Sequence, residues 1–316
     1  MWIAKPEEVK AKVSDWVQRY PDFLFVEMLT QFTGHKVYAL TVTDKSVKDE
    51  SKVRVIFAVP HAHEPAGTAA CINVINQLLT GGDLEGRPTD IDRSVALNKL
   101  ILSFIPDANP YGRAKSPEKW WDGTKCTNEE FLNIAFGVDE DGGRFHRYGR
   151  WCSLEHKPKT IGIVYEKVWD HVYVEPNRDW SSSYFKLMIR LLPRHKRNLF
   201  LDLHQTEFEK QPYNAEVILP APQEELPGDI KRCNVKWGQY LIKALSKAGA
   251  NVKSEPKPLG YTGEQREYFV RYGGIITRST PTLTVEVQNN NSRTPPDLQL
   301  KLHEAVIKAT IYKLII

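Results

Sequence analysis

The sequence predicts an α/β fold, because short apolar runs alternate along the chain with longer amphipathic segments. Three such runs, read as buried strands, cover residues 53–59, 198–201 and 282–285. The first is followed by His61-Ala62-His63-Glu64, the second leads into Asp202-Leu203-His204, and the third leads into Glu286. Ligands of an open α/β sheet collect outside the carboxyl ends of its strands, so these polar residues are expected to converge.

The first hundred residues predict a helix, a hairpin and a strand–helix–strand unit. Apolar residues recur at helical spacing from Pro6 to Arg19. Strands at 23–32 and 36–42 are joined by Thr33-Gly34-His35, a glycine turn typical of hairpins. The strand at 53–59 precedes a helix at 65–79, which Gly81-Gly82 ends. An apolar strand at 98–105 then leads into a turn at 106–112.

Residues 113–176 read as a long insertion, because charged and aromatic residues alternate there without a clean period. It contains one predicted helix, from Thr127 to Phe136, which starts with a capping box of Thr127 and Glu130. Long irregular insertions in compact domains are usually functional or flexible, so we interpret this one as a lid or wall of the site. A surface excursion that packs on its own tryptophans is the alternative.

The second half predicts three further helices. They cover residues 181–196, 229–248 and 297–314, the second ended by Gly249 and the third preceded by Pro295-Pro296. With 316 residues, the chain is long enough for one large α/β domain or two small ones.

Charge and cysteine content exclude several classes of function. The formal charge of +4 comes from 43 basic and 39 acidic residues dispersed along the chain, which argues against nucleic-acid binding. No apolar window reaches the length of a membrane span, and the amino end lacks the apolar core of a secretory signal. The four cysteines are far apart without CxxC spacing. We therefore expect a cytoplasmic protein with reduced thiols, bound neither to nucleic acid nor to a membrane.

The residues at the strand ends predict a single zinc ion. A catalytic zinc takes three protein ligands, often two histidines and a glutamate, and keeps one position for water or substrate. His61 and Glu64 are three residues apart, so a helical turn would bring both side chains to one ion. His204 is the best placed distant ligand. His63 stays an alternative to His61, and Asp202 is expected to reach the same region only if its strand bends.

These residues resemble the M14, carboxypeptidase A-like family of zinc metallocarboxypeptidases. The family's HxxE is similar to 61–64, its Asn-Pro-Asp-Gly turn to Asn109-Pro110-Tyr111-Gly112, and its Asn-Arg pair to Asn177-Arg178. His204 matches the third ligand, and 282–287 resembles the strand that carries the general base. The resemblance implies one domain over 1–316, with a mixed, largely parallel twisted sheet and helices on both faces.

The resemblance also implies a mechanism and a substrate with a free C-terminal carboxylate. Zinc acidifies water and polarises the scissile carbonyl, and Glu286 acts as general base and acid. Asn177 and Arg178 hold the carboxylate of the peptide, since a guanidinium binds carboxylates bidentately.

Three further roles follow from the resemblance by position. An arginine should stabilise the oxyanion. Arg113 is favoured because it follows the 109–112 turn, and the other candidates are Arg144, Arg147 and Arg150. Tyr261 matches a mobile-loop tyrosine, with Tyr268 and Tyr272 as competitors. An ungapped count from Glu286 to the specificity position gives Arg271, which would favour an acidic C-terminal side chain.

Other zinc amidases on the same scaffold are the nearest alternatives. An N-acyl-amino-acid deacylase is one, since Asp202-Leu203-His204-Gln205-Thr206 is also similar to aspartoacylase-like enzymes. A deglutamylase and a murein-peptide amidase are others. An inactive binding protein is an alternative of a different class, against which the intact set of ligands and base argues. The oligomeric state stays open.

Overall fold

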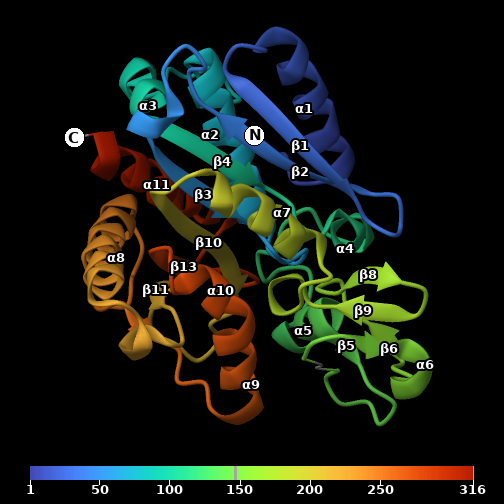
Figure 1. The fold of residues 1–316 in the computed structure, drawn as a ribbon. Helices are drawn as coiled ribbons and strands as arrows, with labels where there is room; N and C mark the ends of the chain where they lie inside the picture. The colour runs from blue at the N-terminus through green and yellow to red at the C-terminus, as the bar shows by residue number, and fades with distance from the viewer. Residues whose placement is uncertain (146–147, 316) are drawn as a thin grey trace.

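A twisted sheet of eight strands carries the candidate site (Figure 1). The computed structural model describes residues 1–145 and 148–315. The order across the sheet is β1-β2-β4-β3-β10-β13-β11-β12. The strands are β1 (Leu24–Thr30), β2 (Lys36–Val42), β3 (Val53–Ala58), β4 (Leu100–Ile105), β10 (Asn198–Thr206), β11 (Ala215–Leu219), β12 (Lys257–Pro258) and β13 (Thr282–Gln288).

Four neighbouring strands in the middle of the sheet are parallel. β4, β3, β10 and β13 run in one direction, whereas β2 pairs antiparallel with β4, and β11 antiparallel with β13. The carboxyl ends of the four parallel strands therefore meet at one edge. The predicted α/β class, with a mixed and largely parallel sheet in a single domain, is confirmed.

Helices cover both faces of this sheet (Figure 1). Side chains alternate between the faces, so Phe57 packs with one set of helices and its neighbour Ile56 with the other. The first set is α1 (Pro6–Arg19), α2 (Pro65–Thr80), α3 (Arg93–Lys99), α8 (Gly228–Ala248) and α11 (Pro296–Ile315). The second set is α7 (Ser183–Leu191) and α10 (Gly274–Thr277).

Most predicted helices begin and end where their capping residues stand. Gly81 and Gly249 end α2 and α8 in the left-handed conformation, with φ of 86° and 105°. α7 is shorter than the predicted helix at 181–196. It ends at Leu191 and continues as the 3₁₀ helix η3 (Leu192–Arg194), in which Pro193 cannot supply a backbone donor.

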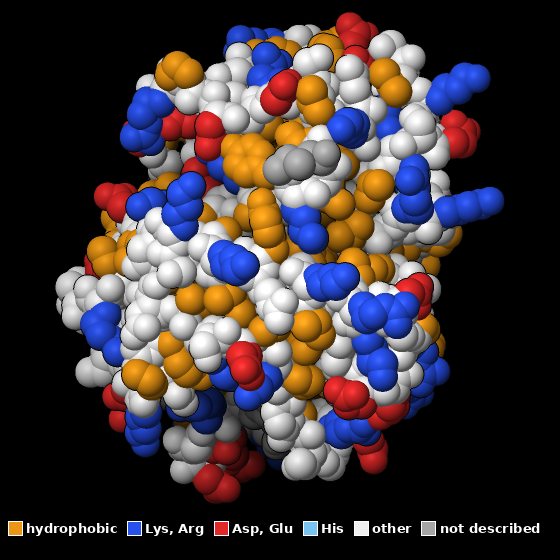
Figure 2. Space-filling view, turned by 90° about the vertical axis from the view of Figure 1, so that its left-hand side faces the viewer, with side chains coloured by type: hydrophobic (Ala, Val, Ile, Leu, Met, Phe, Trp, Pro, Cys, Tyr) orange, Lys and Arg blue, Asp and Glu red, His pale blue; other side chains and the backbone are white. Residues whose placement is uncertain are grey.

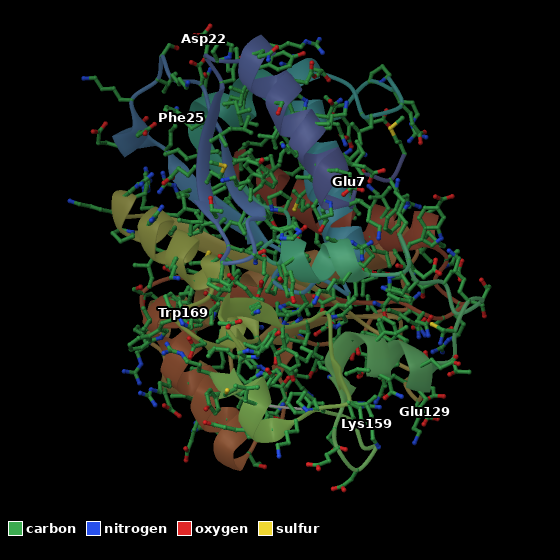
Figure 3. All side chains as sticks on the ribbon, turned by 90° about the vertical axis from the view of Figure 1, so that its right-hand side faces the viewer. Glu7, Asp22, Phe25, Glu129, Lys159 and Trp169 are labelled. Carbon is green, nitrogen blue, oxygen red and sulfur yellow. The ribbon has the colours of Figure 1, made fainter. Side chains whose placement is uncertain are left out.

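The insertion between β4 and α7 consists of short elements. Its helices are α4 (Pro110–Lys115), α5 (Asn128–Phe136), α6 (Ser153–His156) and the 3₁₀ helix η2 (Pro176–Arg178). Its strands are β5 (Gly137–Val138), β6 (Trp151–Cys152), β7 (Thr160–Ile161), β8 (Glu166–Trp169) and β9 (Val172–Val174). In Figure 3, Glu129 and Lys159 of this insertion lie at the end of the molecule opposite Asp22 and Phe25.

The predicted turn at 106–112 contains the start of α4. Asn109 caps this helix, because its Oδ1 accepts a hydrogen bond from the Gly112 backbone N–H at 3.2 Å. Its Nδ2 donates to the carbonyl oxygens of Ile163 and Val164, so the same side chain holds the insertion to the end of β4.

Between β12 and β13 lies a continuous helical segment. It comprises α9 (Gly263–Tyr268), the π-helix η5 (Phe269–Gly273) and α10. Two further 3₁₀ helices are η1 (Asp49–Ser51) and η4 (Gln223–Glu225). Within the described residues, no helix is both long and apolar enough to cross a bilayer. Figure 2 shows lysine and arginine side chains scattered over one face rather than gathered into a continuous patch.

Candidate metal centre and pocket

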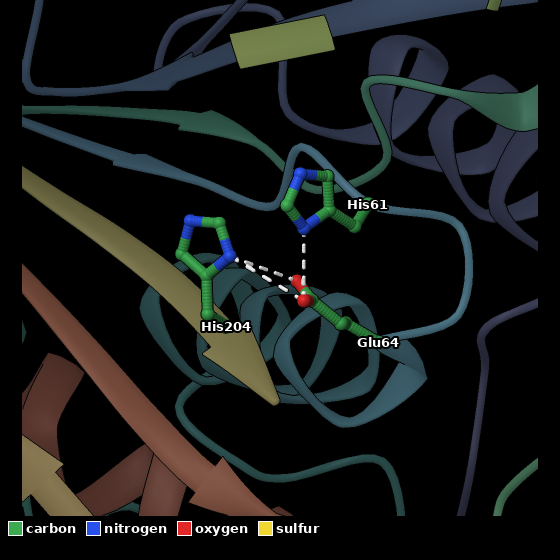
Figure 4. A group of neighbouring side chains, drawn as sticks. All are labelled: His61, Glu64 and His204. Atoms are coloured by element: carbon green, nitrogen blue, oxygen red, sulfur yellow. Dashed lines mark hydrogen bonds and ion pairs between the residues drawn. The ribbon is translucent and has the colours of Figure 1, made fainter. Parts of the chain in front are cut away.

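His61, Glu64 and His204 converge at the carboxyl ends of β3 and β10 (Figure 4). One donor atom from each lies within 4.8 Å of the other two. The Glu64 carboxylate is in the middle: Oε1 lies 2.9 Å from Nδ1 of His61, and Oε2 lies 3.2 Å from Nδ1 of His204. A turn, closed by a hydrogen bond from Glu64 N–H to the His61 carbonyl, brings the first two residues together.

The second ring nitrogen of each histidine faces another carboxylate. Nε2 of His61 lies 3.1 Å from Oε1 of Glu175, and Nε2 of His204 lies 3.0 Å from Oδ2 of Asp202. Carboxylates in this position fix the tautomer and the orientation of metal-binding imidazoles. Asp202 needs no bend in the strand, because residues two apart share a strand face. The expectation that it reaches the site only through a bend is therefore corrected.

The charges of this group fit a cation. Burial disfavours the imidazolium of His61, but Glu64 and Glu175 outweigh this effect and raise its pKa to about 9. Burial likewise opposes the charged form of Glu64, yet His61 and His204 hold its pKa well below the usual range. Two imidazoles and a carboxylate, all buried, are a donor set that suits a catalytic zinc. The residues present therefore fit the metal that the sequence predicts.

His63 is not part of this set of converging donors. Its ring stacks on that of His61, with centroids 5.4 Å apart, and contacts Phe131 and Phe136, while its Nε2 lies 3.5 Å from Oε1 of Glu64. Burial lowers its pKa to about 4, so the imidazole is neutral at pH 7. Of the two candidates, the structure thus brings His61 to the other ligands.

A cavity of about 340 Å³ opens beside the three converging residues and contains Glu286. The parallel register of β10 and β13 sets Glu286 directly opposite His204. Burial raises the pKa of Glu286 to about 8; Glu64 adds to this increase and His204 opposes it. A carboxyl with a pKa near neutrality can both accept and donate a proton at physiological pH.

Asn177 and Arg178 line the same cavity from η2. Asn177 Oδ1 lies 3.3 Å from Nε2 of His61. Arg178 pairs with Oε2 of Glu175 at 2.9 Å, and its guanidinium lies over the rings of Tyr148 and Phe269 at 5.1 and 5.2 Å. Glu175 therefore connects the candidate metal ligand His61 to the arginine that is predicted to bind substrate.

Tyr261 also lines the cavity, and its ring stacks on Phe269 with centroids 4.6 Å apart. Its competitor Tyr268 instead stacks on Tyr148, and it is absent from the cavity wall formed by the described residues. The Tyr272 side chain lies outside the described part of the structure.

The structure does not bring Arg113 to the cavity. Its buried guanidinium donates hydrogen bonds to the backbone carbonyls of Ala4, Ala62, Glu118 and Lys119 and to the Ser116 hydroxyl. This placement corrects the expectation of an oxyanion-binding Arg113: the side chain braces the turn between His61 and His63. Arg144 and Arg150 are exposed and lie outside the cavity wall, and Arg147 lies outside the described residues.

Arg271 faces away from the cavity. Residues 265, 269, 273, 276 and 277 of the segment α9–η5–α10 line the cavity, at spacings of one helical turn. Residues 266, 267, 270, 271, 274 and 275 lie on the opposite side, around a separate shallow depression. An ungapped count cannot reproduce helical phase, so the acidic preference inferred from Arg271 loses its basis.

Sequence reasoning missed Glu175, whereas it did propose the insertion as a lid or wall of the site. Phe131, Leu132 and Phe136 of α5 line the cavity, as a wall would. Glu175 stands two residues before Asn177, at the end of the apolar strand β9. A carboxylate at the end of a strand, close to the predicted Asn177–Arg178 pair, is the sequence feature that could have identified Glu175.

Comparisons with known proteins give a family and a set of similar folds. The family model of zinc carboxypeptidase, Peptidase_M14, matches residues 9–206. The fold is similar to that of carboxypeptidase A from Helicoverpa armigera, with a TM-score of 0.60 and 16% identity over 99% of this chain and 73% of that one. It is also similar to a metallo-carboxypeptidase from Burkholderia cenocepacia, with a TM-score of 0.57 and 16% identity over 97% and 68%.

A third similar structure is a metallo-carboxypeptidase from Pseudomonas aeruginosa in complex with (2-guanidinoethylmercapto)succinic acid. Its TM-score is 0.54, with 14% identity over 97% of this chain and 70% of that one. Comparison with curated protein sequences gives no match. At these identities the solved structures support the fold, whereas the family model matches well over half of the sequence. The chain therefore belongs to the Peptidase_M14 zinc carboxypeptidase family.

Proposed function

We propose that this protein is a zinc metallocarboxypeptidase that removes the C-terminal residue of peptides, with one zinc ion held by His61, Glu64 and His204. One observation carries the proposal. The three candidate ligands, the buried carboxyl of Glu286 and the Asn177–Arg178 pair all line a single cavity. A hydrolase that acts at chain ends needs these three functions, metal, base and carboxylate anchor, within the length of one residue.

Glu286 is suited to move the proton of the reaction. When bound, a zinc ion would polarise the scissile carbonyl and make a nearby water molecule more acidic. Glu286 in its carboxylate form takes a proton from this water and delivers it to the leaving amine. A neighbouring cation lowers the pKa of a carboxyl, so the value of about 8 shifts towards neutrality when the metal is present.

Arg178 and Asn177 provide the anchor for the terminal carboxylate. Arginine suits this role because its planar fork binds both carboxylate oxygens. The ion pair with Glu175 and the ring of Phe269 restrict the guanidinium to the cavity wall, which reduces the entropy lost when substrate binds.

The test is mass spectrometry of a mixed peptide pool, in free-acid and amidated forms, after incubation with zinc-loaded protein. We expect loss of single C-terminal residues from the free acids only, and no loss after treatment with a chelator. Glu286→Gln should keep its zinc and lower kcat by roughly 10²- to 10⁴-fold.

Other outcomes would change the assignment. Intact peptides in the presence of bound zinc, together with hydrolysis of N-acyl-amino acids, would favour the deacylase alternative. Cleavage of amidated and free peptides at equal rates would rule out a carboxylate anchor.

We also retain three proposals: one peptidase domain over 1–316, an insertion at 113–176 that forms a wall of the cavity, and a cytoplasmic location, in keeping with four free cysteines.

A further inference from the structure

The cavity extends along the sheet, away from the candidate metal ligands. β10 and β13 pair in the order His204 with Glu286, Asp202 with Thr284, and Phe200 with Thr282, and all six residues line the cavity. Parallel strands rise about 3.3 Å per residue, so the Phe200–Thr282 pair lies roughly 13 Å from the His204–Glu286 pair. The inner end is therefore deep enough for a large side chain.

The inner end of the cavity is apolar and aromatic. Ile276 of α10 packs there with Tyr184, Phe185 and Phe200. The pair between Glu286 and the inner end carries Asp202, and its carboxylate faces His204 and Tyr184. This wall favours an uncharged ring.

One hydroxyl of the cavity wall, next to Ile276 in sequence, lacks a hydrogen-bond partner among the described residues. Thr277 precedes β13 by five residues, and its Oγ1 is buried with no hydrogen-bond partner in the described part of the chain. Helical threonines commonly bond to the carbonyl three or four residues earlier, and this hydroxyl does not. Unsatisfied buried polar groups are costly, so a site that leaves one open is suited to a ligand that completes it.

We infer that Thr277 determines specificity by binding the polar tip of a tyrosine side chain at the C-terminus of the substrate. The inference rests on the proposed carboxypeptidase function. A phenol combines an apolar ring, which the aromatic wall accommodates, with one hydroxyl for Thr277. Phenylalanine fits the same apolar wall, but it has no hydroxyl, so the Thr277 hydroxyl stays without a hydrogen-bond partner.

The test compares kcat/KM for peptides that differ only in a terminal tyrosine or phenylalanine. A neutral hydrogen bond corresponds to a preference of about fivefold for tyrosine. Thr277→Val should reduce this ratio to about one, and Thr277→Ser should preserve it. Thr282→Val is the matched control, because the Thr282 hydroxyl already donates to the Thr280 carbonyl at 2.8 Å, and it should keep the wild-type ratio.

A binding measurement separates this inference from the proposed function. Calorimetry with N-acetyl-tyrosine and N-acetyl-phenylalanine needs no turnover and should show the same fivefold difference, lost in Thr277→Val. Tighter tyrosine binding without peptide cleavage would support Thr277 and overturn the carboxypeptidase. Cleavage with equal rates for both residues, or a preference that survives Thr277→Val, would overturn the role of Thr277 alone.

Discussion

In each of the two candidate histidine ligands, the ring nitrogen Nε2 contacts a carboxylate. Glu175 faces His61 and Asp202 faces His204, so both rings direct Nδ1 towards Glu64. A fixed ring loses little freedom when a metal binds, and a carboxylate partner increases the basicity of the donor nitrogen. In the described part of the chain, Nδ1 of His63 is buried without a hydrogen-bond partner, and its imidazole is neutral. This contrast gives a direct test of the ligand set.

We expect His61→Ala to lose bound zinc and His63→Ala to retain it. Removal of a ligand leaves two protein donors, whereas His63 contributes none of the three converging atoms. The measurement is zinc content by elemental analysis after gel filtration, with circular dichroism to show that both variants are folded. Loss of zinc from His63→Ala alone would reverse the assignment of the two histidines.

Single residues show what the sequence could and could not predict. The spacing of His61 and Glu64 and the strand-end position of His204 were sufficient to predict that these three residues converge, because both depend on local geometry. Arg271 was misplaced because an ungapped count ignores helical phase. Arg113 was misplaced because a guanidinium several bonds from the backbone takes its partners from distant segments. Arg113 donates to carbonyls near residues 4, 62 and 118, which no local pattern indicates.

At the scale of elements, one buried carboxyl joins the insertion to the helix that follows it. Glu166 of β8 accepts hydrogen bonds from the backbone N–H and the hydroxyl of Ser183, at the first turn of α7. Burial raises the pKa of Glu166 to about 7, although the bonds from Ser183 oppose this rise. The side chain is 2% exposed, so its ionisation must affect this junction.

Glu166 should make the protein less stable as the pH increases towards neutrality. Its pKa is higher in the folded chain than the ordinary 4.5, so its contribution is complete below pH 4.5 and is lost as the pH rises through 7. In Glu166→Gln the side chain cannot ionise, so this part of the stability is not lost as the pH rises. At pH 8 the variant should be more stable than the wild type by on the order of 2 to 3 kcal/mol.

Thermal unfolding at pH 5 and pH 8 measures the effect of Glu166. Glu129→Gln is the control, since it makes the same substitution at an exposed position of α5. Equal destabilisation by Glu166→Gln at both pH values would mean that Ser183 requires a charged acceptor.

The elements that sequence reasoning missed are short or lack a clear period. The strands of the insertion have two to four residues, too few for alternation to be visible. β11 was missed because five residues with Glu216 in their midst give a weak signal, although all five are buried. Helices that end at a left-handed glycine, such as α2 and α8, were predicted almost to the residue.

At the scale of the whole molecule, the candidate ligands join segments that are distant in sequence. Glu64 directly precedes α2, and His204 lies in β10, so one ion would connect neighbouring strands of the sheet. A ligand that binds only the folded state stabilises it, by about 4 kcal/mol at a concentration of 1,000 times Kd. Zinc should therefore raise Tm by several degrees.

Thermal unfolding with added zinc and with a chelator tests this coupling. Glu64→Gln provides the control, because a neutral amide in the middle of the donor set should remove the response to zinc. An identical Tm in both conditions for the wild type, despite bound metal, would show that the site forms independently of the folded sheet.

Along the paired strands β10 and β13, the residues proposed for bond cleavage and those proposed for substrate selectivity occupy different positions. The first pair of residues carries the candidate ligand and the base, the second carries Asp202, which contacts His204, and the Phe200–Thr282 pair lines the cavity farther along the sheet. Substitutions at 200 or 277 therefore alter which side chain is accepted without displacing His204 or Glu286. Such a layout lets a new preference evolve, or be engineered, in steps that leave the hydrolytic groups in place.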